Sequence, residues 1–308
     1  MAETVAIIGA GTIGASWTSY FLAQGCDVRV WDPAEGFAER THEFVARVWP
    51  ILEQLGFADG ASRDRAVYCD NLSDALSGVT FVQESGPEDA AVKTALIAEI
   101  DAHLPAEIVI SSSSTALPTS EFQGGAAHPE RVVLGHPFNP PHLMPLVEVG
   151  GGKQTVTWAV DRAMAFYESV GKSPVRLRAE IPGHLANRLQ AAVYREAVHL
   201  VAEGYATVAD IDKAMSGGPG LRWAFMGPHM TYHLGGGAGG IANYFEILGA
   251  SQERRWEALG APELTDEVKQ QIIAGVVEEA AGRSIDELAA ARDETLLNLL
   301  KALGKSAI

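Results

Sequence analysis

The stretch Gly135 to Val149, GHPFNPPHLMPLVEV, contains the residues best suited to acid–base chemistry. His136 ends a predicted buried strand, and Glu148 lies twelve residues further on, in the next predicted strand. A carboxylate beside an imidazole fixes its tautomer and stabilises the imidazolium that forms when it takes a proton. The pair therefore indicates a general base for alcohol oxidation, because hydride leaves carbon only as the hydroxyl proton is removed. The alternative is a hydrogen-bonded structural histidine.

A glycine-rich motif near the start of the sequence indicates a dinucleotide site. Gly9, Gly11 and Gly14 follow a predicted strand and open a predicted helix, with Thr12 and Ile13 between the last two glycines. The first glycine permits a tight turn, the second lets the backbone approach a pyrophosphate, and the third allows close packing of helix on strand. The positive end of the helix favours the phosphate charge.

Asp32 ends the second predicted strand, 18 residues after Gly14. A carboxylate at this place accepts hydrogen bonds from the adenosine ribose hydroxyls. It would repel the 2′-phosphate of NADP, and Pro33-Ala34-Glu35 offers no arginine to neutralise that group. The sequence therefore predicts NAD as the cofactor, with FAD as a weaker competitor for the same motif.

Strand and helix patterns alternate through the first part of the chain. The predicted strands cover 4–9, 27–32, 79–84, 107–111, 131–138, 146–149 and 174–177, and helical patterns include 90–104 and 156–170. From Gly183 onward the periodicity is helical throughout. We therefore expect an α/β protein: a Rossmann-type doubly wound sheet over 1–182, followed by an all-α domain over 183–308.

The composition and net charge of the chain indicate which partners it does not bind. The 308 residues are 47% hydrophobic and 20% charged, with a formal net charge of −16, which is typical of a folded globular protein that binds neither nucleic acid nor a membrane surface. No apolar run reaches the length of a membrane span. Cys26 and Cys69 have no metal-type spacing. These features predict a cytoplasmic protein with two structural thiols.

Several ordered motifs together resemble the 3-hydroxyacyl-CoA dehydrogenase superfamily. They are GAGTIG at 9–14, Glu84 after a strand, SSSST at 111–115, HPFNPPHLMPLVEV at 136–149 and the asparagine of GHLANR at 183–188. The likeness covers nearly the whole chain. It implies an NAD-dependent dehydrogenase in which His136 and Glu148 form the catalytic pair.

The same resemblance implies roles for further residues. A serine after the strand and an asparagine at the start of the helical domain hold the substrate oxygen, and these match Ser114 and Asn187, with Ser113 as the alternative serine. Glu84 and Lys93 match family positions near the nicotinamide ribose, and Asn139 matches a family asparagine close to the base. For Lys93 the alternative is a solvated helix residue.

The substrate is expected to be a small free L-3-hydroxy acid. Two segments resemble the branch of the family that contains carnitine dehydrogenase and L-gulonate 3-dehydrogenase. They are residues 136–149 and the sequence GPGLRWAFMGPHMTYHLGGG at 218–237. Family members that use CoA have a long lysine-rich helical pair after the second strand, and the segment from Ala34 to Gly78 has no lysine. A short-chain 3-hydroxyacyl-CoA dehydrogenase is the alternative enzyme.

Three features of the helical domain are weaker candidates. Arg222 could pair with a substrate carboxylate through two parallel hydrogen bonds, or form an interface ion pair. Trp223 belongs to an aromatic set that could hold a quaternary ammonium or simply pack in a core; its other members are Phe225, Tyr232 and Tyr244. His229 and His233 have a metal-type spacing, but hydride transfer to NAD needs no metal, so no metal is expected.

Two alternatives without catalytic activity remain. Lens lambda-crystallin resembles this branch, so the chain could be structural, and an NAD-binding sensor would keep Gly9, Gly11, Gly14 and Asp32 without turnover. The joint presence of His136, Glu148 and Asn187 favours an enzyme. By the same resemblance we expect the helical domain over 183–308 to bind the substrate and to form a homodimer.

Overall fold

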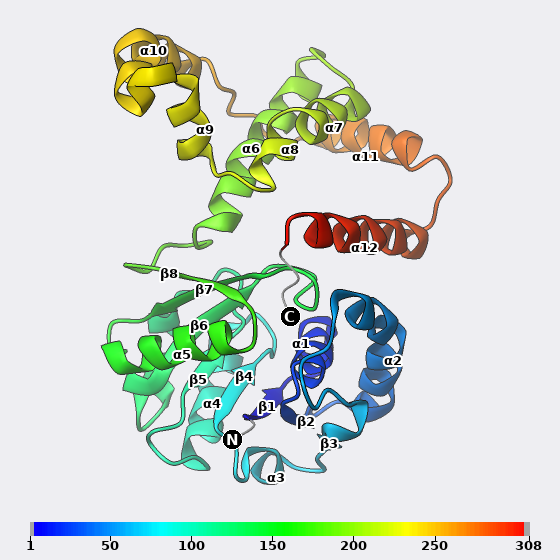
Figure 1. Ribbon diagram of the computed structural model, residues 1–308, viewed down its shortest axis with the longest axis vertical. Coiled ribbons are helices and arrows are strands. Elements are labelled where there is room, and N and C mark those ends of the chain that lie inside the picture. The colour runs from blue at the N-terminus through cyan, green and yellow to red at the C-terminus, as the bar shows by residue number, and fades with distance from the viewer. Residues whose placement is uncertain (1–2, 305–308) are drawn as a thin grey trace. The chain divides into compact units, whose positions relative to one another are not determined.

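The computed structural model describes residues 3–304, and its centre is one eight-stranded sheet (Figure 1). The strands are β1 (Thr4–Ile8), β2 (Asp27–Trp31), β3 (Ala66–Tyr68), β4 (Phe81–Glu84), β5 (Ile110–Ser112), β6 (Val132–Pro137), β7 (Leu146–Gly151) and β8 (Ser173–Arg176). Their order is β3-β2-β1-β4-β5-β6-β7-β8, and every neighbouring pair is parallel except β6 with β7. The first six strands have the Rossmann order, with the switch point between β1 and β4.

Helices cover both faces of this sheet. One buried cluster joins the sheet to α1 (Thr12–Ala23), α2 (Phe37–Leu55) and α5 (Thr157–Ser169). The other joins it to α3 (Leu72–Leu76) and α4 (Ala90–Ala102). Strands buried from both sides must be apolar along their length, as VAII of β1 is. The predicted doubly wound sheet is confirmed.

The chain forms two compact units, 3–186 with 291–304, and 187–290. The second unit is helical. Its helices are α6 (Ala186–Ala202), α7 (Val208–Gly217), α8 (Pro219–Trp223), α9 (Pro228–Gly235), α10 (Gly240–Glu257) and α11 (Asp266–Ala280). The predicted helical domain is thereby confirmed, and the glycines of 235–240 form a short 3-10 turn, Gly237–Gly239, between two helices.

The last helix, α12 (Ile285–Ala302), crosses the division between the units. Leu297 and Leu300 are buried in the core cluster that contains α1 and α2. Periodicity marks 285–302 as helical but cannot say which core its apolar side chains enter, and therefore the sequence assigns the whole of 183–308 to one domain. Within the described residues no helix is both long and apolar enough to cross a membrane.

Candidate active site

The glycine motif forms the turn between β1 and α1. Gly9 has φ +96°, and a Cβ there would lie 2.7 Å from the backbone of Ser85, which follows β4. A Cβ on Gly14 would collide with the carbonyl oxygen of Gly9. Both positions therefore require glycine, the first for its conformation and the closeness of the next strand, the second for the packing of helix on turn.

Gly11 differs from its two neighbours, because a Cβ on it would meet nothing within 4 Å. It is the N-cap of α1, no side chain caps the helix, and the first turn carries no acidic residue. Thr12 and Ile13 begin this first turn. Uncapped N–H groups beside open space suit a pyrophosphate, which must approach the backbone closely. The residues present fit the phosphates of NAD.

Asp32 follows β2 and is fixed by two backbone donors. Its Oδ2 accepts from the N–H of Ala10 at 2.7 Å, and its Oδ1 accepts from the N–H of Ala34 at 2.8 Å. Each carboxylate oxygen retains a second lone pair. The side chain is thus oriented beside the glycine turn, where it can accept from ribose hydroxyls.

His136 and Glu148 face each other across the antiparallel pair β6 and β7. The register pairs the two residues directly, and the Nδ1 of His136 lies 2.9 Å from Oε2 of Glu148. Both side chains are buried, with 4% and 1% of their surface exposed. Burial alone would raise the pKa of Glu148, but hydrogen bonds from His136 and from the amides of Ala186 and Leu185 outweigh it and lower that pKa.

An ionised Glu148 can only accept, so His136 carries its proton on Nδ1 and presents a free Nε2. The strand pairing thereby gives the imidazole of His136 a defined tautomer, and it brings together the two side chains that the sequence predicts to meet. The second oxygen of Glu148 accepts from Leu185 at 2.7 Å and from Ala186 at 3.0 Å. The same carboxylate therefore orients the imidazole of His136 and binds the backbone at Leu185 and Ala186.

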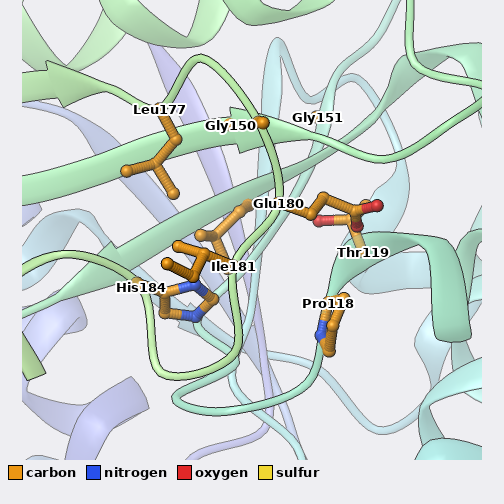
Figure 2. A pocket seen from close by; sticks show the side chains of 10 residues that line it. Pro118, Thr119, Gly150, Gly151, Leu177, Glu180, Ile181 and His184 are labelled. Carbon is orange, nitrogen blue, oxygen red and sulfur yellow. The ribbon is translucent and has the colours of Figure 1, made fainter. Parts of the chain in front are cut away.

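His184 is a neighbour of His136 that the sequence did not single out. Its ring centre lies 5.0 Å from that of His136, and its ring is 2% exposed. Burial lowers the pKa of His184, so the ring is neutral at neutral pH, and its Nε2 donates to the carbonyl of Ser114 at 3.1 Å. Figure 2 shows His184 beside Ile181 in the pocket that they line with Gly150 and Gly151. The one signal for His184 in the sequence is the preceding Gly183, which permits a sharp turn.

Glu84 and Lys93 form a buried ion pair beside the glycine turn. The Nζ of Lys93 donates to both carboxylate oxygens of Glu84, at 3.0 and 3.1 Å, and both side chains are at most 1% exposed. The alternative of a solvated lysine is wrong for Lys93, since the helix α4 packs its stem against the sheet and the carboxylate balances its charge. Ser112 also donates to Glu84, at 2.5 Å.

The serines after β5 have different partners. Ser113 lies between Gln83 and Ser85, with Oγ distances of 2.8 and 2.9 Å. Ser114 is fully buried and donates to Glu88 at 2.7 Å. The same oxygen of Glu88 accepts from the backbone N–H groups of 115–117, at 2.8 to 3.1 Å. Glu88, which the sequence reasoning missed, therefore anchors the loop that contains Ser114.

The remaining predicted residues lie in two places. Asn139 is exposed in the turn after β6. Asn187 is the first residue of the second unit, and Arg222 and Trp223 are exposed on α8 in that unit. Tyr232 and Tyr244 pack against each other with their rings tilted by 41° and their ring centres 4.8 Å apart, and Tyr244 is 5% exposed.

Family models match both parts of the chain. The model of the 3-hydroxyacyl-CoA dehydrogenase NAD-binding domain covers residues 4–181, and that of the C-terminal domain covers 183–271. L-carnitine dehydrogenase of Nocardiopsis dassonvillei is 49% identical over 98% of this chain and 92% of its own length. The corresponding protein of Pseudomonas putida is 42% identical over 99% of this chain and 95% of its own.

Solved structures are similar as well. The crystal structure of 5-formyl-3-hydroxy-2-methylpyridine 4-carboxylic acid 5-dehydrogenase has a TM-score of 0.85 and 27% identity, over 99% of both chains. The structure of 3-hydroxybutyryl-CoA dehydrogenase from Escherichia coli K12 has a TM-score of 0.68 and 27% identity, over 89% of this chain and 57% of that one.

Proposed function

The chain belongs to the 3-hydroxyacyl-CoA dehydrogenase family, and from that premise we propose that this NAD-dependent 3-hydroxy acid dehydrogenase oxidises L-carnitine at its 3-hydroxyl to the 3-keto acid. The observation that carries the choice of substrate is identity of 48 to 49% with three L-carnitine dehydrogenases over 98% of this chain. The His136–Glu148 pair and the glycine turn supply what the reaction needs, a base and a dinucleotide cradle.

His136 acts as the general base. Its Nε2 accepts the proton of the substrate hydroxyl, and Glu148 stabilises the imidazolium that results. The glycine turn and Asp32 would hold NAD, which would supply the acceptor for the hydride of carbon 3. A serine of the loop after β5 and Asn187 donate to the substrate oxygen and polarise the ketone in the reverse direction.

Glu84 and Lys93 lie near the nicotinamide ribose, and Asn139 lies near the base. In the second unit Arg222 binds the substrate carboxylate, and the face of Trp223 attracts the quaternary ammonium. The exposure of both side chains supports the assignment, since each is available to a ligand. No lysine lies between Ala34 and Gly78 to bind the phosphates of CoA.

The test is NADH formation from L-carnitine, D-carnitine, L-gulonate, free 3-hydroxybutyrate and 3-hydroxybutyryl-CoA, each with NAD and with NADP. Turnover of L-carnitine with NAD supports the proposal. Turnover of the CoA ester alone would place the chain with the acyl-CoA enzymes, and turnover of gulonate alone would correct the substrate within the branch. A His136→Ala variant that binds NADH but has lost turnover is the matching control for the base.

We infer a homodimer formed through the second unit. That unit exposes many large apolar side chains, among them Leu189 at 61%, Phe245 at 62%, Ile247 at 68% and Trp256 at 60%. Apolar surface of this extent is typical of a protein interface. Light scattering after gel filtration should give twice the mass of 32.7 kDa, and a monomer at micromolar concentration would contradict the inference.

We also infer that the enzyme works in the cytoplasm. Cys26 and Cys69 are both free and buried, as is usual in a reducing compartment. Cell fractionation with an antibody against the chain tests this, and recovery from a secreted fraction would contradict it.

A further inference from the structure

His184 is a buried residue beside His136 to which neither the sequence motifs nor the reaction assigns a role. It lies between β8 and α6, is 2% exposed, and its ring centre is 5.0 Å from that of His136. Its backbone has φ +50°, a left-handed conformation that is unfavourable for residues other than glycine. Such strain persists only where the surrounding structure imposes it, and it is concentrated at functional sites.

Two sets of hydrogen bonds fix His184 beside His136. The Nε2 of His184 donates to the carbonyl of Ser114 at 3.1 Å, which orients the ring. The next residue, Leu185, donates its N–H to Oε1 of Glu148 at 2.7 Å, and the other oxygen of the same carboxylate accepts from the ring of His136. Glu148 therefore joins the backbone beside His184 to the imidazole of His136.

The imidazole of His136 needs more than Glu148 to hold its plane. Their 2.9 Å hydrogen bond restrains one distance, whereas the ring turns about two bonds, and the second torsion angle of histidine has broad minima. Two rings restrict this motion, those of His184 and of Phe138, whose centre is 6.0 Å from that of His136. His184 is the nearer of the two. It therefore limits the angles at which Nε2 of His136 can meet a substrate hydroxyl.

The ring of His184 is uncharged in this position. Burial lowers the pKa of His184 and outweighs the carboxylates of Glu148 and Glu88, which raise that pKa. A positive charge on His136 lowers the pKa of His184 further. The neutral ring can thus stay packed against His136 after this residue has accepted a proton, because no second positive charge repels the imidazolium.

We propose that His184 is a positioning residue that fixes the plane of the His136 imidazole, so that Nε2 meets the substrate hydroxyl at a productive angle. This assignment rests on the proposed dehydrogenase function. His184 acts through His136 and takes no proton from the substrate.

The test compares the wild type with His184→Gly. Glycine adopts the left-handed backbone without strain, so the variant should fold and bind NADH, and it lacks only the ring. The kcat for L-carnitine should fall about 10- to 100-fold, with KM and the Kd for NADH changed by less than about threefold, because only the alignment of reacting groups is lost. Unchanged kcat would overturn the proposal.

A deuterium isotope effect distinguishes slow chemistry from other defects of His184→Gly. The substrate is L-carnitine deuterated at carbon 3, from which the hydride leaves. The isotope effect on kcat should be no smaller than in the wild type, because a misaligned base slows the step in which the hydride is transferred. Loss of the isotope effect would place the defect in another step and would contradict the positioning role.

His184→Phe is the conservative variant. A phenyl ring can pack against His136 but cannot donate to the carbonyl of Ser114. Because the packing of the ring is the contact that acts on His136, the kcat of His184→Phe should lie between those of the wild type and His184→Gly. Equal kcat for the two variants would show that the ring does not position His136.

Ala281→Gly is the matched control for the change in the backbone. Besides glycines, Ala281 and His184 are the two residues with positive φ in the described part of the chain, and Ala281 is the C-cap of α11 in the second unit. Its replacement relieves a similar strain, so it should raise the melting temperature and leave kcat unchanged. A loss of kcat as large as that of His184→Gly would attribute the effect to backbone relaxation and overturn the proposal.

Crystal structures separate this proposal from the proposed function. If the wild type turns over no hydroxy acid, the function fails, and the structures of the wild type and His184→Gly with NADH then decide the positioning role. A His136 ring that is turned, or that has no single orientation, in the variant supports the role. The same ring orientation in both proteins overturns it.

Discussion

At the scale of single residues, Glu148 must satisfy two sets of donors at once. One oxygen accepts from the ring of His136, and the other accepts from the amides of Leu185 and Ala186. Only a carboxylate offers an acceptor on each side, because an amide group has one acceptor and one donor. Glutamine at position 148 would therefore lose the hydrogen bonds on one side or the other.

Glu148→Gln should lower kcat by about 10²- to 10⁴-fold, since its NH₂ must face either the backbone amides or the imidazole, and in the second case it imposes the wrong tautomer. The measurement is steady-state turnover, with NADH binding by fluorescence as the control. Unchanged kcat would show that Glu148 does not set the tautomer of His136.

Asp32 gives a second prediction at this scale. Asp32→Ala should raise the Kd for NAD and reduce the preference for NAD over NADP, because the carboxylate that accepts from the ribose and repels a 2′-phosphate is gone. The ratio of kcat/KM with the two cofactors measures this. Asp59, whose carbonyl lies near Gly25 away from the turn, is the control site for an Asp→Ala change. An unchanged ratio would contradict the assigned role.

At the scale of elements, the turn from β6 to β7 is held by parts of the chain far from it in sequence. His142 bonds to Ser16 of α1 through its ring, at 2.8 Å, and through its backbone N–H, at 2.9 Å. Lys172, just before β8, donates to the carbonyls of Pro141 and Met144 at 2.5 and 3.0 Å. The strand that contains His136 is thereby fixed to α1, the helix that follows the glycine turn.

The glycine turn between β1 and α1 gives a matched pair of variants. Gly11→Ala should leave the melting temperature nearly unchanged and weaken NADH binding, because its Cβ enters only the space meant for the pyrophosphate. Gly14→Ala should lower the melting temperature, because its Cβ collides with the carbonyl of Gly9. Thermal shift with and without NADH distinguishes the two, and equal NADH binding by Gly11→Ala and the wild type would argue against the cradle.

At the scale of the whole molecule, the first unit combines an N-terminal segment with a C-terminal segment in one hydrophobic core. The sheet and α1 come from residues 4–176, while Leu297 and Leu300 of α12 complete the same core. Its interior also holds His142 neutral, since burial lowers the pKa of this ring from 6.5 to about 3. Folding of this unit is therefore linked to pH.

Between pH 6.5 and 3 the unfolded chain binds a proton at His142 that the folded chain does not, so stability should fall as the pH is lowered, by about 1.4 kcal/mol per pH unit. Burial lowers the pKa of His184 as well, which adds to the effect. Urea unfolding of the wild type and of His142→Gln from pH 7 to 5 measures this, and the variant should show the smaller slope. His42→Gln, at an exposed position of α2, is the control. Equal slopes for the wild type and His142→Gln would refute the linkage.

The sequence by itself determined the features whose residues lie close together in the chain. The glycine turn with Asp32 follows from one strand–helix–strand unit, and the pairing of His136 with Glu148 follows from one hairpin-like pair of strands. Residue types and their spacing within a short segment are enough to predict both features. The alternation of strands and helices likewise predicts the doubly wound sheet.

Only the tertiary structure decided which distant side chains meet. Gln83 reaches Ser113 across 30 residues and Tyr167 across 84, and His184 reaches Ser114 across 70. No local pattern records such a pairing, because it depends on which strands become neighbours and on which side chains the helices bury. The same reason explains why Lys93 is an interior cation and why α12 completes the core of the first unit: periodicity shows which face of a helix is apolar, but the fold decides what that face meets.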